Sequence, residues 1–311
     1  MISRTAQFLL AFELTCYVGL GVWLTLTQRV EWFGALAIIV ALLVILRMVV
    51  PLAGFVVASV LRLSSGERLK WRDTFLALAR EIWARALSFT LVQPFEKWLM
   101  ADEPYPPSRS ATGLPVLLLH GYVCNRGVWR AMRRKLAARL PNPFFTISLE
   151  TPFASVEHYL PQLAAKVEEI CALTNADRVV IVAHSLGGLV ARAYITRGAG
   201  RTRVAKLITL GSPHHGTKMA PLGIGRNALQ MRYGNDWLAQ LATQERAHPS
   251  GVPLTCLYTE NDDLVCPSES GRLPGAKNIA LHAVGHVSLL FSTQVAELVA
   301  EEIRIVKSAT D

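Results

Sequence analysis

"RVVIVAHSLGG", residues 178–188, is the stretch that decides the fold of this chain. Its first six residues are almost wholly apolar, as expected of a strand buried in a parallel sheet, and two glycines follow Ser185 closely. A serine in a tight turn between a strand and a helix exposes its hydroxyl above the sheet edge, where the helix N-terminus favours negative charge. Such a serine is either a nucleophile or a plain helix cap, so its partners must decide.

The C-terminal two-thirds of the chain alternates short apolar runs with helical segments. The runs expected to be strands are 114–119, 144–149, 178–183, 206–211, 253–258 and 278–284. The segments expected to be helices are 126–140, 155–174, 186–198 and 288–306. This alternation predicts an α/β fold with a mostly parallel sheet and helices on both faces. Ligands of such sheets bind beyond the carboxyl ends of the strands, which is where Ser185 is expected.

A serine nucleophile needs a base, and the base needs a carboxylate that orients it. In this fold the three residues follow one another as serine, acid and histidine. Among the late histidines, His248 precedes a strand and His282 lies inside an apolar run, whereas His286 follows the last strand in "VGHVSLL". His286 is therefore the predicted base. The acid is expected after the preceding strand, where "YTENDDLVCP", 258–267, offers Glu260, Asp262 and Asp263.

Five motifs together resemble the bacterial lipases and esterases of the α/β-hydrolase superfamily. They occur in that family's order and are "LLLHGY" 117–122, "AHSLGG" 183–188, "GSPHHGT" 211–217, "NDDLV" 261–265 and "GHVSLL" 285–290. The resemblance implies an α/β-hydrolase that cleaves carboxylic esters, as triacylglycerol lipases do. In the family pattern the catalytic Asp stands three residues before a Val, which favours Asp262 and leaves Asp263 as the alternative.

The same resemblance implies an oxyanion hole made by the backbone N–H groups of Tyr122 and Leu186. Gly121 lets the backbone approach the substrate closely, and His120 is expected to orient this loop. His214 is expected at the rim of the acyl pocket. No metal is expected, because adjacent histidines at 214–215 point apart and no carboxylate lies near them in sequence. No cofactor is expected either.

The first hundred residues are unusually apolar. The whole chain is 51% hydrophobic and 18% charged, with a mean hydropathy of +0.32, so a membrane segment is expected. The runs at about 6–27 and 33–61 are each long enough to span a bilayer, which predicts a two-helix membrane hairpin over 1–66. A cleaved signal peptide is the alternative for the first run, but a second apolar run follows at once.

Each predicted span carries one charge near its middle, Glu13 in the first and Arg47 in the second. Both lie roughly 21 Å from the turn at a rise of about 1.5 Å per residue, so they sit at the same depth. Pairing would lower the cost of burying them, which is about 3 kcal/mol for one charge at mid-membrane. Separate snorkelling to the nearer interface is the alternative.

The remaining segments complete the predicted domain organisation. Residues 67–101 are expected to form an amphipathic helix, 102–113 a proline-rich linker, and 114–311 the catalytic domain. Residues 218–245 are expected to be either a mobile lid or helices packed permanently on the core. More Lys and Arg residues follow the second span than occupy the turn between the spans. The positive-inside rule then predicts a bacterial inner-membrane protein with a cytoplasmic catalytic domain.

These observations predict a membrane-anchored serine hydrolase that cleaves lipid esters through an acyl-enzyme. The net charge of +9 fits anionic headgroups better than nucleic acid, because the basic residues lack interleaved aromatics. The partners expected are thus a lipid or ester substrate and the bilayer, without nucleic acid. There are two alternatives. One is an acyltransferase or thioesterase with the same triad, and the other is a catalytically inert membrane-bound protein with a binding or transport-associated role.

Overall fold

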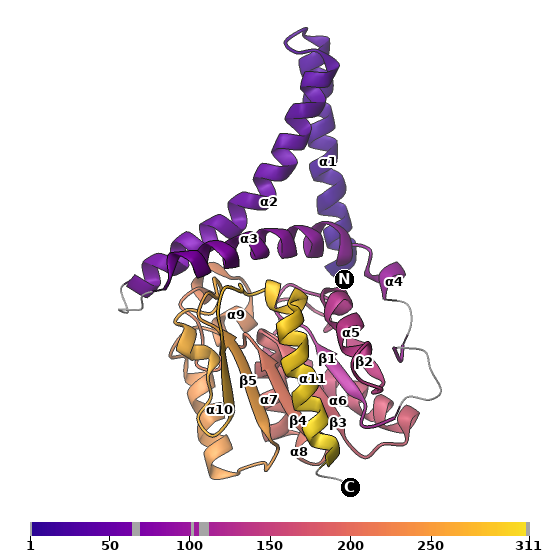
Figure 1. Ribbon diagram of the computed structural model, residues 1–311, viewed down its shortest axis with the longest axis vertical. Helices are drawn as coiled ribbons and strands as arrows, with labels where there is room; N and C mark the ends of the chain where they lie inside the picture. Colours follow the sequence, from indigo (N-terminus) through magenta and orange to yellow (C-terminus); the bar gives the residue numbers. More distant parts are fainter. Residues whose placement is uncertain (1, 64–68, 101–102, 106–111, 309–311) are drawn as a thin grey trace.

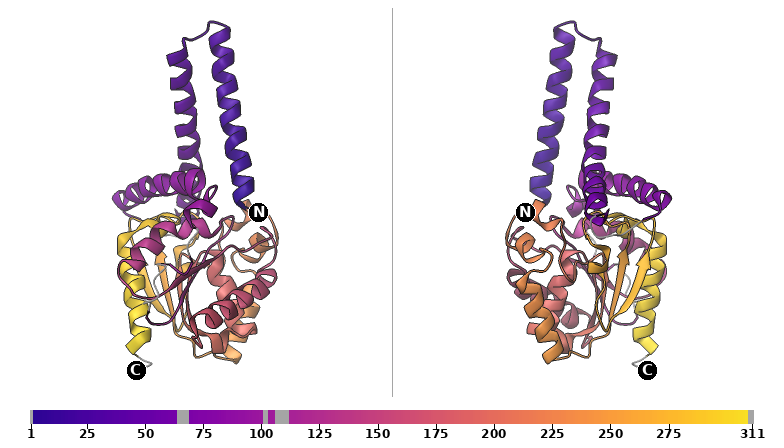
Figure 2. Two further views of the ribbon diagram at one scale, coloured as in Figure 1. Left: turned by 90° about the vertical axis from the view of Figure 1, so that its right-hand side faces the viewer. Right: turned by 90° about the vertical axis from the view of Figure 1, so that its left-hand side faces the viewer.

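The computed structural model describes residues 2–63, 69–100, 103–105 and 112–308. Most of the predicted 102–113 linker and both ends of the predicted 67–101 segment lie outside these ranges. A long helical hairpin stands on one end of an α/β domain, with helix α3 lying between them (Figure 1). The two legs meet at the far turn and spread apart toward the domain (Figure 1), and the side views show both legs reaching the same end of it (Figure 2).

The α/β domain is built on one sheet of six parallel strands in the order β2-β1-β3-β4-β5-β6. The strands are β1 Val116–Leu119, β2 Phe144–Ile147, β3 Val179–His184, β4 Val204–Leu210, β5 Leu254–Thr259 and β6 Lys277–Leu281. Every residue of β1, β3 and β4 is buried, because helices cover both faces of a parallel sheet. The fold class predicted from the alternation of elements is confirmed.

Two apolar layers sandwich the sheet. Helices α6 Val156–Thr174, α7 Leu186–Arg197 and α10 Asp236–Ala247 pack on one face, and α5 Arg130–Ala137 and α11 Thr293–Ser308 pack on the other. Shorter helices, α8 Gly200–Arg203 and α9 Arg226–Gln230, lie in the connections. The parallel register places the carboxyl ends of β3, β4, β5 and β6 along one edge, beneath the hairpin (Figure 1).

Helices α1 Ile2–Leu26 and α2 Trp32–Leu63 form the hairpin, and each is long and apolar enough to cross a membrane. Of the two sequence-based alternatives for the mid-span charges, pairing is the one found, because Arg47 Nη1 donates to Glu13 Oε1. Arg47 Nε also donates to Thr90 Oγ1 at 3.2 Å. That threonine belongs to the π-helical turn η1 Ser88–Val92, which extends α3 Trp71–Leu87 and precedes α4 Glu96–Leu99.

The segment 218–245 divides into two parts. Its second part is largely α10, whose Leu241 is buried and whose Glu245 forms a 2.6 Å ion pair with Arg192 of α7. Its first part contains α9 and carries Leu222 and Ile224, which are exposed. Only this first part has the exposed apolar surface of a cover, and its role as a lid stays a prediction.

A buried charge cluster ties α11 to the sheet. Glu302 accepts hydrogen bonds from Lys206 Nζ at 2.5 Å, Lys277 Nζ at 2.5 Å and Thr255 Oγ1 at 2.8 Å. Burial raises the pKa of the Glu302 carboxyl, but the hydrogen bonds from the two lysines outweigh burial and hold that pKa at about 2. The carboxylate is therefore ionised and balances the charge of Lys206, which is buried beside it.

We expect Glu302→Gln to lower the free energy of unfolding by about 3 kcal/mol, because it leaves the ammonium of Lys206 buried without a counter-charge. Urea titration of the full chain in detergent micelles, followed by circular dichroism, measures the loss. Glu301→Gln is the control, since Glu301 is the exposed neighbour on the same helix. Equal losses in the two variants would contradict the importance of the buried cluster.

Candidate active site

Ser185 occupies a strained turn between β3 and α7. Its backbone has φ 54° and ψ −125°, a conformation that residues other than glycine rarely adopt. The turn closes only because small residues follow, since a Cβ at Gly187 would lie 2.6 Å from the carbonyl oxygen of His120. The side chain of Ser185 caps no N–H of α7 in the described part of the chain. The helix-cap interpretation of this serine is therefore wrong.

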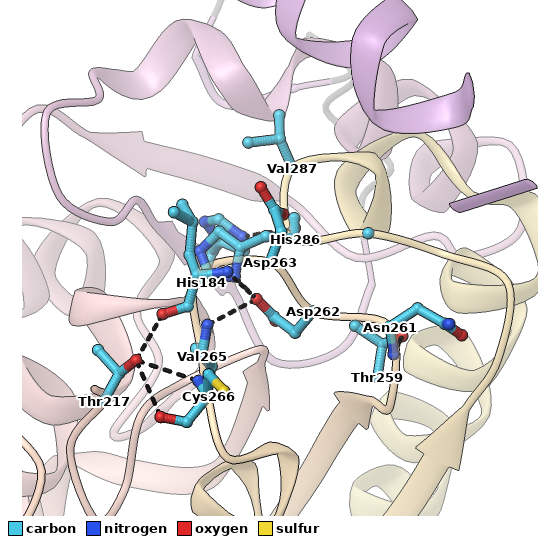
Figure 3. A network of polar contacts seen from close by, with 12 residues as sticks. His184, Thr217, Thr259, Asn261, Asp262, Asp263, Val265, Cys266, His286 and Val287 are labelled. Carbon is cyan, nitrogen blue, oxygen red and sulfur yellow. Dashed lines mark hydrogen bonds and ion pairs between the residues drawn. The ribbon is translucent and has the colours of Figure 1, made fainter. Parts of the chain in front are cut away.

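His286 and Asp262 meet at the same edge of the sheet, from the loops that follow β6 and β5 (Figure 3). The imidazole Nδ1 of His286 lies 2.9 Å from Asp262 Oδ2. The other oxygen, Oδ1, accepts from the N–H groups of Leu264 at 2.9 Å and Val265 at 2.8 Å. The structure thus brings Asp262 to the imidazole, as the family pattern implied.

The two side chains support each other's charge state. Burial raises the pKa of the Asp262 carboxyl, but His286 and the two backbone N–H groups outweigh burial and lower it. Burial lowers the pKa of the His286 imidazole, but the charge and hydrogen bond of Asp262 outweigh burial and raise it, with smaller contributions from Glu81 and Asp263. An ionised carboxylate only accepts hydrogen bonds, so Nδ1 of His286 carries a proton and Nε2 is left to accept one.

Ser185 and His286 line one cavity of about 610 Å³. No hydrogen bond joins the Ser185 hydroxyl to the imidazole among the described residues, which is common before substrate binds. His184 contacts the loop that carries His286, because its Nε2 lies 3.1 Å from the backbone oxygen of His286. Burial lowers the pKa of His184 to about 3, so this imidazole stays neutral.

The loop expected to supply the oxyanion hole lies directly against the serine. A Cβ at Gly121 would come within 2.7 Å of Ser185 Cβ, so only glycine permits this approach. The N–H groups of Tyr122 and Leu186 donate to no backbone carbonyl within the described ranges, which leaves both for a ligand. The hydroxyl of Tyr122 donates to the carbonyl oxygen of Ile224 at 2.8 Å and accepts from its N–H at 2.9 Å.

His120, expected to orient the loop, and His214, expected at the rim of the acyl pocket, are both buried and hydrogen-bonded within the protein. His120 Nε2 accepts from the N–H of Leu149 at 2.9 Å, and burial lowers the pKa of its imidazole to about 4. It orients the loop that carries Gly121. The Nε2 atom of His214 lies 3.0 Å from Thr209 Oγ1. His214 does not line the cavity, whereas its neighbour Pro213 does.

Asp263, the alternative acid, points into a different cluster. Its Oδ2 accepts from Arg85 Nη2 at 2.6 Å, and Arg85 Nε donates to Glu81 Oε1 at 2.7 Å. Burial and the nearby charge of Glu81 raise the pKa of Asp263 to about 7, against the lowering effect of Arg85. Asp263 therefore contacts helix α3, whereas Asp262 contacts His286.

Glu81 is the contact residue that sequence reasoning missed. Its two carboxylate oxygens accept from the N–H groups of Val287 and Ser288, each at 2.9 Å, directly after His286. A Cβ at Gly285 would lie 2.6 Å from Glu81 Oε2, so the loop wraps closely around this carboxylate. The sequence did carry a signal, because Glu81 and Arg85 are four residues apart and so lie on one face of the helix. Ala77 and Ala84, on the same face, are buried, so this face packs against the α/β domain.

Comparison with known proteins finds the same fold in lipases. Residues 115–250 match the family model described as palmitoyl protein thioesterase. The mature lipase BlEst2 of Bacillus licheniformis superposes with a TM-score of 0.57 at 20% identity, over 65% of this chain and 96% of that chain. Lipase B of Aspergillus fumigatus superposes with a TM-score of 0.56 at 19% identity, over 67% of this chain and 57% of that chain. The chain therefore has the α/β-hydrolase fold of these lipases, and its residues 115–250 are similar to the palmitoyl protein thioesterase family.

Proposed function

We propose that the chain is a membrane-anchored serine hydrolase that cleaves acyl esters of lipids through Ser185, His286 and Asp262. The observation that carries this proposal is the 2.9 Å contact between His286 and Asp262 at the wall of the cavity that also contains Ser185. The strained turn places the serine at the cavity wall, which is the geometry that an activated nucleophile needs.

The reaction proceeds in two acyl transfers. His286 Nε2 takes the proton of Ser185 Oγ, which attacks the ester carbonyl carbon, and the N–H groups of Tyr122 and Leu186 bind the oxyanion. The imidazolium then gives its proton to the leaving oxygen, which departs and leaves an acyl-enzyme. Water, deprotonated by the same histidine, releases the fatty acid and restores Ser185. Asp262 keeps the imidazole in the required tautomer throughout.

Thioester cleavage is the second candidate, and the match to the palmitoyl protein thioesterase family model favours it. The same residues serve both reactions, because only the leaving atom changes from oxygen to sulfur. The two substrates can be distinguished by measuring kcat/KM for a palmitoyl oxyester and for the palmitoyl thioester that differs from it only in having sulfur in place of the ester oxygen. A higher kcat/KM for the thioester would favour the thioesterase function.

Membrane anchoring rests on the surface of the hairpin. Apolar side chains along α1 and α2, among them Phe8, Phe12, Val44 and Val60, are more than half exposed, which water disfavours and a bilayer satisfies. Both legs meet the α/β domain at the same end of the hairpin (Figure 2). This places the domain on the same side of the proposed bilayer as both ends of the hairpin, and the Lys and Arg residues on that side favour the cytoplasm.

We expect Ser185→Ala and His286→Ala each to lower kcat for ester hydrolysis by about 10⁴-fold or more, because each removes a group that the others depend on. Hydrolysis of p-nitrophenyl esters by the full chain in detergent measures the loss. His282→Ala is the control, since this exposed histidine contacts Glu260 at 3.2 Å and lies away from Ser185. Wild-type activity in Ser185→Ala would refute the proposed nucleophile.

The same assay distinguishes the roles of the adjacent residues Asp262 and Asp263. We expect Asp262→Asn to lower kcat by about 10⁴-fold, because an amide no longer fixes the imidazole tautomer. Asp263→Asn removes a contact to Arg85 and is expected to cost less than about tenfold. The reverse order of the two losses would assign the acid to Asp263.

Glu81→Gln is expected to extend activity to lower pH. The negative charge of Glu81 raises the pKa of His286, and the base works only when neutral, so removing the charge lets His286 stay neutral at lower pH. The acid limb of kcat/KM should therefore move down, together with a fall in kcat as the loop loses one acceptor. Asp73→Asn, in the first turn of the same helix, is the control. A fall in kcat with an unmoved limb would leave Glu81 a purely structural role.

A further inference from the structure

The cavity above Ser185 extends beyond the α/β domain into the hairpin. One wall is formed by the catalytic loops and by the first part of the 218–245 segment, with Ser185, His286 and Met219 among its residues. The opposite wall is formed by residues 6–13 of α1, residues 46–51 of α2 and the turn η1. We call the space between these two stretches of α1 and α2 the fork.

The fork is open at its sides. Leu9 of α1, Val50 of α2 and Phe89 of η1 line the cavity, yet 58%, 57% and 43% of their surfaces remain exposed. The cavity therefore reaches the outer surface of the hairpin between the helices, on a surface that a bilayer would cover. Figure 1 shows the two helices diverging toward the α/β domain, with α3 crossing below them.

The chemistry of the fork suits a hydrocarbon chain. The side chains that line the fork are apolar apart from a few polar groups. Of these polar groups, the Glu13–Arg47 pair lies farthest from the α/β domain along α1 and α2. The two charges neutralise each other, and Arg47 is also held by Thr90. Such a space offers water few hydrogen-bond partners, whereas each methylene of a hydrocarbon chain that is buried there is favourably removed from water.

We propose that the fork is the acyl-chain binding site and that the substrate is a long-chain fatty acyl ester resident in the bilayer. The chain enters sideways between α1 and α2, its methyl end lies toward the Glu13–Arg47 pair, and its carbonyl carbon reaches Ser185. This inference rests on the proposed function. It adds that the membrane hairpin itself selects the substrate.

A tryptophan placed in the fork tests the site by chain length. Leu10→Trp fills space that only a long chain occupies, so kcat/KM for p-nitrophenyl palmitate should fall about tenfold or more while that for p-nitrophenyl butyrate is unchanged. Leu20→Trp is the matched control, because Leu20 lies on the same helix beyond the cavity. Equal effects on both esters, or no effect on either, would overturn the proposal.

A covalent probe locates the chain directly. A long-chain alkyl fluorophosphonate with a diazirine at its far end phosphonylates the serine. Oγ bonds to phosphorus, fluoride leaves, and His286 takes the hydroxyl proton. After illumination of the full chain in phospholipid vesicles, peptide mapping should place the cross-link in residues 6–13 or 46–51. Cross-links confined to 218–231 would overturn the fork as the site, whereas failure to label Ser185 at all would refute the proposed function itself.

Discussion

The carboxylate of Glu81 is the interaction on which the candidate site depends. It accepts two hydrogen bonds from the consecutive N–H groups of Val287 and Ser288, and so fixes the loop that carries His286. Hydrogen bonds to a charged group are the strong ones, and these two are buried, so leaving either N–H unpaired is expensive. The proposed base, His286, is thus positioned by α3, which lies outside the sheet that carries the serine.

The acid loop is held from two directions. Thr217 Oγ1 accepts from the N–H of Cys266 at 3.0 Å and donates to the carbonyl oxygen of Leu264 at 2.7 Å, which fixes the turn after Asp262 (Figure 3). From the hairpin side, the guanidinium of Arg62 donates to the carbonyl oxygen of Asp262. A Cβ at Gly54 of α2 would lie 2.8 Å from Asp263 Oδ2, so the membrane helix packs directly on this loop. The hairpin therefore contributes contacts to the candidate site, in addition to its proposed role as an anchor.

How much of the site the sequence could predict depends on how far apart in sequence the interacting residues lie. The strand–turn–helix around Ser185 has a local pattern, and the order of elements in the sheet predicts His286 and an acid among Glu260, Asp262 and Asp263. Only the resemblance to the bacterial lipases favoured Asp262 among these three. The contacts of Glu81 join residues more than 200 positions apart, and no local pattern reports them. His214 was misplaced for a similar reason. Its motif follows β4 as expected, but its imidazole turns into the core toward Thr209, while Pro213 reaches the cavity.

The Glu13–Arg47 pair links anchoring to substrate geometry. A charge at mid-membrane costs about 3 kcal/mol, and pairing two charges at one depth lowers that cost. A buried ion pair adds little stability, because desolvation offsets the attraction, but losing one partner strands the other. Its effect is therefore to fix how α1 lies against α2, with Thr90 adding a third contact from η1. Below that fixed point the legs separate, and the apolar space between them leads to Ser185. If the fork binds the acyl chain as we propose, this pair sets how far that chain extends into the hairpin.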